Sequence, residues 1–318
     1  MVTFQDIERA YAVLKPVVHK TPLLSSSTLN SRLGNEVWFK AENFQRVGAF
    51  KFRGAYNKIA SLSGDEGRRG VIAHSSGNHA QGVALASKLF GLQAVIVMPH
   101  NSVRSKVEAT KGYGANVVFC EDSTDDRERV TEELIRSHGY TLIHPFNDEK
   151  LIAGQGTAGL ELRQDLSSLD YLFVPVGGGG LISGCATAVK HLFPGVKVIG
   201  VETEGANDAY QTFREKRIVK IPSATTIADG MRTLSIGTLN FEIIMKHVDD
   251  IITVQDTDVL AMMKYFFERM KIVVEPTGAV APAAVFTRKL GVTGKKICAI
   301  ISGGNVDPEV FRSMLAAV

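Results

Sequence analysis

Short apolar runs alternate along the chain with longer segments in which apolar residues recur at helical spacing. Residues 172–176 contain no polar side chain, as expected for a parallel strand whose sheet is covered by helices on both faces. Residues 80–90 instead repeat apolar positions three and four apart, and Gly91 follows directly, which is typical of a helix that ends there. The same patterns predict further strands at 37–41, 71–73, 94–98, 116–120, 140–144, 196–201, 251–254 and 296–302, and further helices at 105–113, 127–138, 153–164, 181–191, 258–270 and 278–290.

Strands separated by helices of about 10–15 residues indicate βαβ units and mostly parallel sheets, which makes this an α/β protein. Residues 70–144 contain a complete alternation of strands and helices of their own. We therefore predict a small α/β domain at 70–145, inserted into a large domain formed by 1–69 and 146–318. A ligand site is expected in the cleft between the two domains.

Charge and composition exclude several classes of function. The chain carries 36 Lys and Arg against 33 Asp and Glu, a net charge of +3 without a basic block, so nucleic acid is not an expected partner. No apolar run is long enough to span a bilayer, and residues 1–10 lack the apolar core of a secretory signal. Cys120, Cys185 and Cys298 are far apart, as is typical of thiols in a reducing compartment. We therefore expect a cytoplasmic protein that binds neither nucleic acid nor membrane.

Four consecutive glycines, Gly177 to Gly180, stand between a predicted strand and a predicted helix. The free N–H groups at a helix N-terminus bind phosphate, and the helix dipole assists. A plain tight turn is the alternative, but four glycines would carry a needless entropic cost there. The run is neither a Walker A loop nor a dinucleotide-binding motif, since no Gly-Lys-Ser/Thr follows and no acidic partner lies at the expected distance.

Three further segments carry polar chemistry. Lys51 stands between Phe50 and Phe52; burial would lower its pKa and free an amine for Schiff-base chemistry, although most lysines are surface residues. Residues 74–79 (HSSGNH) open the helix at 80 with hydroxyl, amide and N–H groups that suit a carboxylate, where an ordinary helix cap is the alternative. Ser302 ends the last strand and would face the crevice in which ligands bind.

These segments together resemble the fold type II pyridoxal 5'-phosphate (PLP) enzymes. Within that family they are most similar to serine racemases and serine/threonine dehydratases, a group that includes L-threo-3-hydroxyaspartate ammonia-lyases. The likeness extends from Thr21 to Asp307. It implies a tryptophan synthase beta-like fold, with two open, twisted, mostly parallel α/β domains and PLP in the cleft between them. The matching segments are 49–55 (AFKFRGA), 75–79 (SSGNH), 177–181 (GGGGL), 275–278 (EPTG) and 302–305 (SGGN).

The resemblance implies a role for each matching residue in binding PLP. Lys51 holds the cofactor covalently, the glycines hold its phosphate, Asn78 bonds its ring hydroxyl and Ser302 meets its pyridine nitrogen. A serine at that nitrogen leaves the ring a weaker electron sink than a carboxylate would, which favours β-elimination. The predicted cofactor-binding residues are Phe50, Lys51, Asn78, Gly177, Gly178, Gly179, Gly180, Leu181, Glu275 and Ser302.

The resemblance also implies two catalytic residues, Lys51 and Ser76, which take the Cα proton from opposite faces of the substrate. Two such bases permit racemisation, while loss of the β-hydroxyl gives dehydration to a 2-oxo acid and ammonia. A serine hydroxyl needs activation to act as a base, so the alternative that Ser76 binds the substrate carboxylate stays open. The predicted substrate-binding residues are Ser75, Ser76, Gly77, Asn78, His79, Arg127 and Asn147.

Small β-hydroxy amino acids are the expected substrates: L-serine, L-threonine and L-threo-3-hydroxyaspartate. Arg127 is the candidate for binding a second carboxylate through its two parallel N–H groups; an arginine paired with acidic neighbours on a helix surface is an equal alternative. A dicarboxylate subsite would make hydroxyaspartate ammonia-lyase the main activity. A PLP β-replacement enzyme of the cysteine synthase type and a non-catalytic PLP-binding regulator remain as alternatives, the latter disfavoured because Lys51 is present.

A metal site is predicted at Glu202, Ala206 and Asp208. Two carboxylates and a backbone carbonyl suit Mg²⁺, Ca²⁺ or Mn²⁺, and the resemblance implies an ion at the same positions. A solvated acidic loop is the alternative.

The resemblance further implies a homodimer. Some relatives are activated by nucleotides, and no set of residues in this sequence decides whether a nucleotide effector binds.

Overall fold

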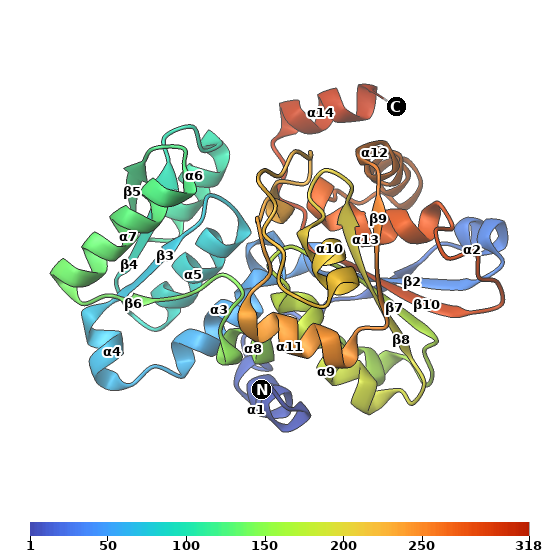
Figure 1. Cartoon of the computed structure of the whole chain (residues 1–318), viewed down its shortest axis with the longest axis horizontal. Coiled ribbons are helices and arrows are strands. Elements are labelled where there is room, and N and C mark those ends of the chain that lie inside the picture. Colours follow the sequence, from blue (N-terminus) through green and yellow to red (C-terminus); the bar gives the residue numbers. More distant parts are fainter. Residues whose placement is uncertain (318) are drawn as a thin grey trace.

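Two separate β-sheets form the frame of the molecule (Figure 1). The computed structural model describes residues 1–317. The large sheet has six strands in the order β1-β2-β10-β7-β8-β9. All its pairs are parallel except β1 with β2. The strands are β1 (Leu23–Ser25), β2 (Glu36–Ala41), β7 (Tyr171–Pro175), β8 (Lys197–Thr203), β9 (Asp250–Val254) and β10 (Lys296–Ile301).

The small sheet has four parallel strands in the order β5-β4-β3-β6. Side chains alternate between its faces, because successive residues of a strand point to opposite sides. Ile96 packs with Val83 of α5 on one face, while Val97 packs toward Leu134 of α7 on the other. The elements are α4 (Gly64–Arg69), β3 (Val71–His74), α5 (Asn78–Leu89), β4 (Ala94–Pro99), α6 (Arg104–Gly112), β5 (Asn116–Cys120), α7 (Thr124–His138) and β6 (Thr141–Leu142).

Helices cover both faces of the large sheet. Leu162 of α8 and Ile182 of α9 pack in the core on one face, and Met262 of α12 and Val280 of α13 pack in the core on the other. This double cover explains the continuous apolar character of β7. The helices are α1 (Phe4–Leu14), α2 (Ser27–Leu33), α8 (Glu149–Asp165), α9 (Gly180–Leu192), α10 (Asp208–Glu215), α11 (Thr238–His247), α12 (Asp256–Tyr265), α13 (Pro276–Phe286) and α14 (Pro308–Ala316).

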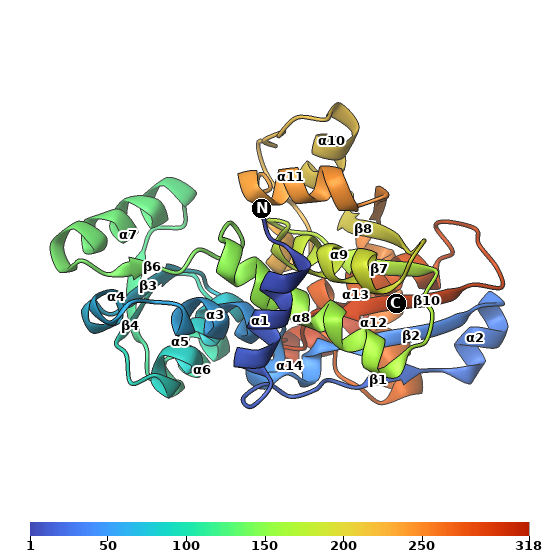
Figure 2. The ribbon, with the colours of Figure 1, turned by 90° about the horizontal axis from the view of Figure 1, so that it is seen from below.

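Helix α3 (Lys51–Ala60) lies between the two sheets, beside α8 (Figures 1 and 2). Its residues Phe52 and Ile59 belong to the core of the small sheet, although they precede that sheet in the chain. On its other side α3 approaches α8 closely, since a Cβ at Gly154 would lie 2.6 Å from the carbonyl oxygen of Arg53. The domain boundaries at 69/70 and 145/146 stay a prediction.

The predicted strands are found in the structure, with small differences in extent. The run at 140–144 contributes just β6 (Thr141–Leu142), and the helix at 258–270 ends in a π-helical turn, η4 (Phe266–Met270). The helices α1, α2, α3, α4, α10, α11 and α14 were not predicted from the sequence. For α3 and α10 the reason is that their buried faces include the charged residues Arg53 and Asp208. Among residues 1–317, no helix combines the length and the hydrophobicity needed to cross a membrane.

Candidate active site

The amine of Lys51 lies where α3 meets the segment that leaves the small sheet. Lys51 is the first residue of α3, and its side chain is half-buried. Its Nζ atom donates a hydrogen bond to the carbonyl of Pro145 at 2.8 Å and lies 5.3 Å from the centre of the Phe50 ring. Burial lowers the pKa of this amine to about 8. Near neutral pH the free base is therefore accessible, and that is the form that attacks a carbonyl.

The segment that precedes Lys51 is fixed to the end of β10. The N–H of Phe50 donates to the carbonyl of Ser302 at 3.1 Å, and Ala49 pairs with Gly303 in an isolated β-bridge. The hydroxyl of Ser302 is buried and has no hydrogen-bond partner among the described residues. A buried polar atom without a partner is costly, so this hydroxyl fits a ligand atom such as the pyridine nitrogen of PLP.

Asn78 and Glu275 meet beside Ser302. The side-chain Nδ2 of Asn78 donates to Glu275 Oε1 at 2.6 Å, and its Oδ1 accepts from Asn305 Nδ2 at 2.8 Å. The other carboxyl oxygen of Glu275 is buried and finds no partner within residues 1–317. Burial raises the pKa of Glu275 to about 8, and the charge of Asp229 acts in the same direction. Burial therefore favours the protonated, neutral form of Glu275.

The glycine run forms a cradle that leaves no room for side chains. Strand β7 ends at Pro175 and α9 begins at Gly180, with Gly179 in the left-handed region at φ +93°. A Cβ at Gly178 would overlap the ring of Phe146, and one at Gly180 would lie 2.5 Å from Gln155 Oε1. The first N–H groups of a helix have no intrahelical partner, so this end of α9 fits a phosphate.

Leu181 was predicted to bind the cofactor, and its side chain lies in the core of the large sheet. Its backbone N–H, in the first turn of α9, is the group that a phosphate would reach. Phe50, the other apolar residue in the prediction, is half-buried beside the amine of Lys51.

The predicted carboxylate site forms the turn between β3 and α5. Ser76 and Gly77 are half-buried, and the N–H of Gly77 donates to Ser75 Oγ at 3.2 Å. A Cβ at Gly77 would meet no atom of residues 1–317 within 4 Å, so the turn faces open space. The side chain of His79 points elsewhere: its Nε2 lies 2.8 Å from the carbonyl oxygen of Ile143 and must be the protonated nitrogen, because a carbonyl can only accept.

Arg127 lies in the first turn of α7, half-buried, with an Nε atom that has no partner among the described residues. The pKa of His74 is lowered by burial and then by the charge of Arg127. The ion pairs of this helix with Asp126 and Glu133 are made by Arg129 instead. These two ion pairs therefore do not involve Arg127, and its binding of a second substrate carboxylate stays a prediction.

Asn147, predicted to bind substrate, holds the start of α11. Its Oδ1 accepts from the N–H of Leu239 at 3.0 Å, and its Nδ2 donates to Thr238 Oγ1 at 3.3 Å.

His144 was not among the predicted site residues. Its Nδ1 accepts from the N–H groups of Phe146 at 3.2 Å and Asn147 at 2.9 Å, which shapes the segment whose Pro145 carbonyl holds Lys51. Burial, with the nearby charges of His74 and Lys51, lowers the pKa of His144 to about 4.

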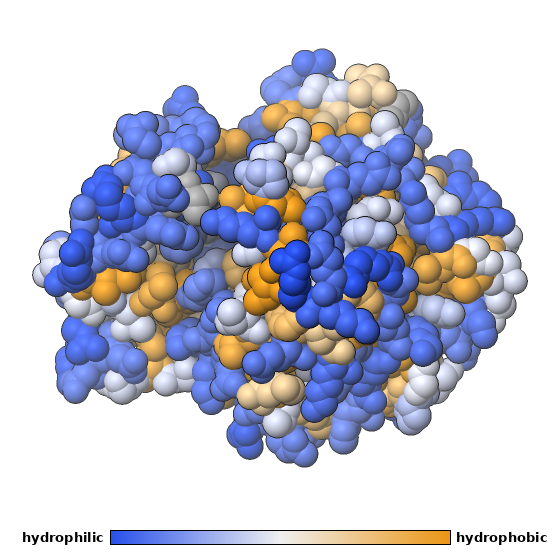
Figure 3. Space-filling view, in the orientation of Figure 1, coloured by the Kyte–Doolittle hydropathy of each residue, from blue (hydrophilic) through white to orange (hydrophobic). Residues whose placement is uncertain are grey.

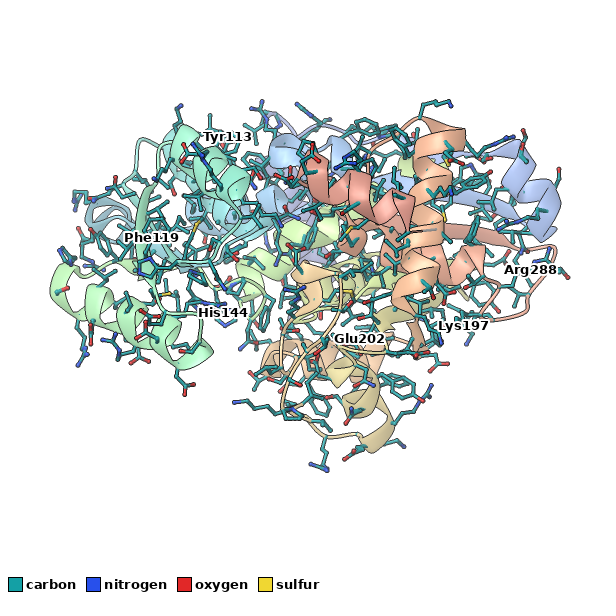
Figure 4. The ribbon with its side chains drawn as sticks, turned by 90° about the horizontal axis from the view of Figure 1, so that it is seen from above. Tyr113, Phe119, His144, Lys197, Glu202 and Arg288 are labelled. Carbon is teal, nitrogen blue, oxygen red and sulfur yellow. The ribbon has the colours of Figure 1, made fainter. Side chains whose placement is uncertain are left out.

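The surface of the molecule is indented between its two parts. Figure 3 shows a notch in the outline between the part that holds the small sheet, at the left, and the part that holds the large sheet. Figure 4 places His144 on the small-sheet side of this boundary. The structure thus brings Lys51, Asn78, Glu275 and Ser302 together, with the glycine cradle and the Ser75–Gly77 turn on elements that meet at the same boundary.

The predicted metal residues surround the turn between β8 and α10: Glu202 lies near the end of β8, Ala206 in the turn and Asp208 at the start of α10. Both carboxyl oxygens of Asp208 are buried and have no partner in the described part of the chain. Glu202 accepts from the N–H groups of Ala209 and Tyr210, at 3.1 and 2.7 Å. Burial raises the pKa of Asp208 to about 7 and that of Glu202 well above its usual value.

Paired buried carboxylates of this kind fit a cation, which would supply the missing charge. The turn offers two carboxylates besides backbone oxygens, and no cluster of three or more His, Cys, Asp and Glu side chains suited to a metal occurs within residues 1–317. Figure 4 shows Glu202 well apart from His144, so this turn does not belong to the reacting centre.

Comparison with known proteins shows the family to which the chain belongs. The family model described as pyridoxal-phosphate dependent enzyme matches residues 14–303. L-threo-3-hydroxyaspartate ammonia-lyase of Saccharomyces cerevisiae is 48% identical over 314 residues, which cover 99% of this chain and 96% of that protein. Serine racemase of Schizosaccharomyces pombe is 46% identical, with 99% and 97% covered. The structure of maize serine racemase superposes with a TM-score of 0.95 at 41% identity, covering 99% of this chain and 98% of that one.

The fold and the site together define a fold type II PLP enzyme, and the chain belongs to the pyridoxal-phosphate-dependent enzyme family. Within that family its similarity to serine racemases and to ammonia-lyases extends over the full length. The predicted fold class and the predicted use of PLP are thereby confirmed.

Proposed function

We propose that this enzyme acts on small β-hydroxy amino acids, racemising L-serine and eliminating water from L-serine, L-threonine and L-threo-3-hydroxyaspartate. The observation that carries the proposal is the amine of Lys51, whose pKa is lowered to about 8 beside the glycine cradle and the buried Ser302 hydroxyl. Its full-length relatives include a hydroxyaspartate ammonia-lyase and a serine racemase.

In this proposal the chain's own residues bind, orient and move a proton. PLP, when bound, supplies the electron sink that acidifies the substrate Cα. The N–H groups at the start of α9 hold its phosphate, Asn78 meets its ring hydroxyl, and the Ser302 hydroxyl meets its ring nitrogen without charging it. The free amine of Lys51 takes the Cα proton on one face, and Ser76 serves the opposite face. The Ser75–Gly77 turn holds the substrate carboxylate.

The first experiment offers L-serine, L-threonine and L-threo-3-hydroxyaspartate separately to the PLP-loaded protein, with Mg²⁺ or with EDTA. Release of 2-oxo acid and formation of D-amino acid are measured in the same samples. Formation of D-serine at a rate comparable to pyruvate supports a racemase with two bases. Oxo acid as the dominant product, fastest with hydroxyaspartate, identifies an ammonia-lyase. If neither product appears while the visible imine band is present, the proposal is wrong.

Hydroxyaspartate ammonia-lyase is the second candidate for the main activity, and Arg127 is the observation that favours it. Its buried Nε has no hydrogen-bond partner among the described residues, and a second substrate carboxylate would provide one. Replacing Arg127 by alanine should lower kcat/KM for hydroxyaspartate by about 10- to 100-fold more than for serine, since a charge-assisted pair contributes on the order of 1.5–3 kcal/mol. Equal losses for the two substrates would remove Arg127 from the specificity argument.

We also propose that the turn of Glu202, Ala206 and Asp208 binds Mg²⁺ or a similar divalent cation in a structural or activating role. The support is the pair of buried carboxylates with raised pKa.

A homodimer and a nucleotide effector stay proposals from the family resemblance, to be tested by light scattering and by titration with ATP. Cytoplasmic location is proposed because the three cysteines are buried and free.

A further inference from the structure

The segment that carries Lys51 contains an arginine two residues later that has no role in the function proposed above. Arg53 is completely buried. Its Nε and Nη2 bind the two oxygens of Glu42 at 2.8 and 2.9 Å, and its Nη1 and Nη2 bind the two oxygens of Glu161 at 2.7 and 2.9 Å. The guanidinium thus makes two bidentate pairs, the arrangement that constrains its orientation most strongly.

Lys40 completes the group. Its Nζ donates to Glu161 at 2.6 Å and to the carbonyl of Thr21 at 2.8 Å. We call Lys40, Glu42, Arg53 and Glu161 the buried charge network. It holds two cations and two carboxylates, and the side chains are at most 1% exposed. Burial would raise the pKa of Glu42, but the charge of Arg53 outweighs it and lowers that pKa, so the carboxylate stays ionised.

The network joins four elements behind the cofactor lysine. Lys40 lies in β2, Glu42 in the turn η1 (Glu42–Phe44), Arg53 in α3 and Glu161 in α8. Lys40 is also paired in the sheet with Ile300 of β10, two residues before Ser302. Residues two apart on a helix point about 200° apart. The ion pairs of Arg53 are therefore made on the side of the first turn of α3 that faces away from the cleft.

Stability alone does not explain this network. Apolar side chains of similar volume usually stabilise a core as well as buried ion pairs do, because removing charges from water is costly. The two bidentate pairs of Arg53 instead fix the orientation of its guanidinium group. We propose that Arg53 is a positioning residue for catalysis: its two bidentate pairs fix the rotation of the first turn of α3 and so aim the amine of Lys51. The proposal rests on the role proposed above for Lys51 as the amine that binds PLP.

The test compares the native protein with the double variant Glu42→Gln/Arg53→Met, which removes one charge of each sign and leaves Lys40 paired with Glu161. The first readout is the melting temperature of the apoprotein. The second is the rate at which added PLP forms a borohydride-reducible bond to Lys51, located by mass spectrometry and followed against pH. The third is kcat and KM for elimination.

We expect the double variant to melt no lower than the native protein. We expect it to react with PLP more slowly, with the midpoint of the pH profile moved up from about 8 toward the ordinary lysine value of about 10.4. Its kcat should fall by about 10²-fold, as for a displacement of about 1 Å at a reacting group. Lys58→Met is the matched control, because Lys58 pairs with Asp148 at 2.7 Å and joins the same two helices away from Lys51; it should react at the native rate.

A folded double variant that reacts with PLP at the native rate and with the native pH profile overturns the proposal. The proposal is also overturned if the rate of PLP attachment falls by no more than the fraction of folded protein falls. If the double variant does not fold, Arg53→Lys carries the test: it keeps the charge, but one ammonium cannot form two bidentate pairs. If folded Arg53→Lys reacts with PLP more slowly than the native protein does, the proposal is supported. If it reacts at the native rate, the proposal is overturned. Failure of the native protein to form the reducible bond would instead refute the proposed function itself.

Discussion

Lys51, Glu275 and Asp208 share one property at the scale of single residues: burial moves the pKa of each toward the uncharged form. The pKa of the Lys51 amine falls to about 8, that of Glu275 rises to about 8 and that of Asp208 rises to about 7. Each group therefore changes charge near neutral pH. Glu275 and Asp208 in addition carry buried oxygens with no partner among residues 1–317, as expected of groups whose partner is a bound molecule or ion.

Replacing Ser76 by alanine should separate the two reactions. Racemisation needs a group on each face of the substrate, whereas elimination needs the proton removed on one. We expect D-serine formation to fall by about 10²- to 10⁴-fold, the usual contribution of a general acid or base, while pyruvate formation falls far less. Both products are measured in one reaction mixture. Parallel loss of both would assign Ser76 to carboxylate binding instead.

Replacing Glu275 by glutamine should stabilise the apoprotein in a pH-dependent way. An unfolded glutamate loses its proton near pH 4.5, whereas the folded protein keeps that of Glu275 to about pH 8. Within this window the folded state binds the extra proton, so the native stability falls as the pH rises. Glutamine removes this dependence and can still accept from Asn78. Its advantage in urea unfolding should grow from none near pH 4.5 to the order of a few kcal/mol near pH 8. Identical curves for the two proteins would contradict the assignment.

At the scale of elements, the glycine cradle should tolerate no side chain. In Gly178→Ala the new methyl group would overlap the Phe146 ring, so the loop or the ring must move. We expect the apoprotein to lose roughly 1–3 kcal/mol of stability, as in other overpacked sites, and to bind PLP more weakly by absorbance titration. Gly112→Ala in α6 is the control, since a Cβ there meets no atom of the described residues within 4 Å. Native PLP affinity in Gly178→Ala would show that the cradle does not hold the phosphate.

The turn between β8 and α10 should respond to Mg²⁺ only when its carboxylates can ionise. A cation must displace protons from Asp208 and Glu202, so Mg²⁺ should raise the melting temperature more near pH 8 than near pH 6. At 100 times its Kd an ion adds about 2.7 kcal/mol. Asp208→Asn should abolish this response, while Glu204→Gln, which alters an exposed carboxylate of the same turn, should keep it. A response that survives Asp208→Asn would place the ion elsewhere.

Sequence patterns predicted those elements and site residues whose chemistry is visible locally. The apolar run of β7 and the glycines after it are one such case. The carbonyl of Pro145 was not predictable, since every residue has a carbonyl and this one meets Lys51 across 94 positions of chain. The contact of Asn78 with Glu275 spans 197 positions. Helix α3 was not predicted because its buried face contains the charged residue Arg53. The carboxylates that neutralise this charge lie on other elements, so the sequence around Arg53 does not show that it is buried.

At the scale of the whole molecule, the site depends on both sheets being held in place. Lys106 of α6 forms an ion pair with Asp229 in the turn η3 (Asp229–Met231), and the next residue, Gly230, donates its N–H to Thr277 Oγ1 at 3.0 Å. Thr277 lies in the first turn of α13, two residues after Glu275. A chain of contacts therefore runs from a helix of the small sheet to the residues around the proposed pyridine site.

The place of β10 in the large sheet has a consequence for how the chain is made. The ribosome releases the N-terminal part first, so all strands of the small sheet are available once residue 142 has emerged. The large sheet must wait, because β10, which joins β2 to β7, is the last strand synthesised. Until then β2 and β7 each present an unpaired edge of the kind that pairs with other chains. A product cut short before Lys296 would keep its small sheet and lose the strand that closes the large one, which makes truncated chains the ones most prone to aggregate.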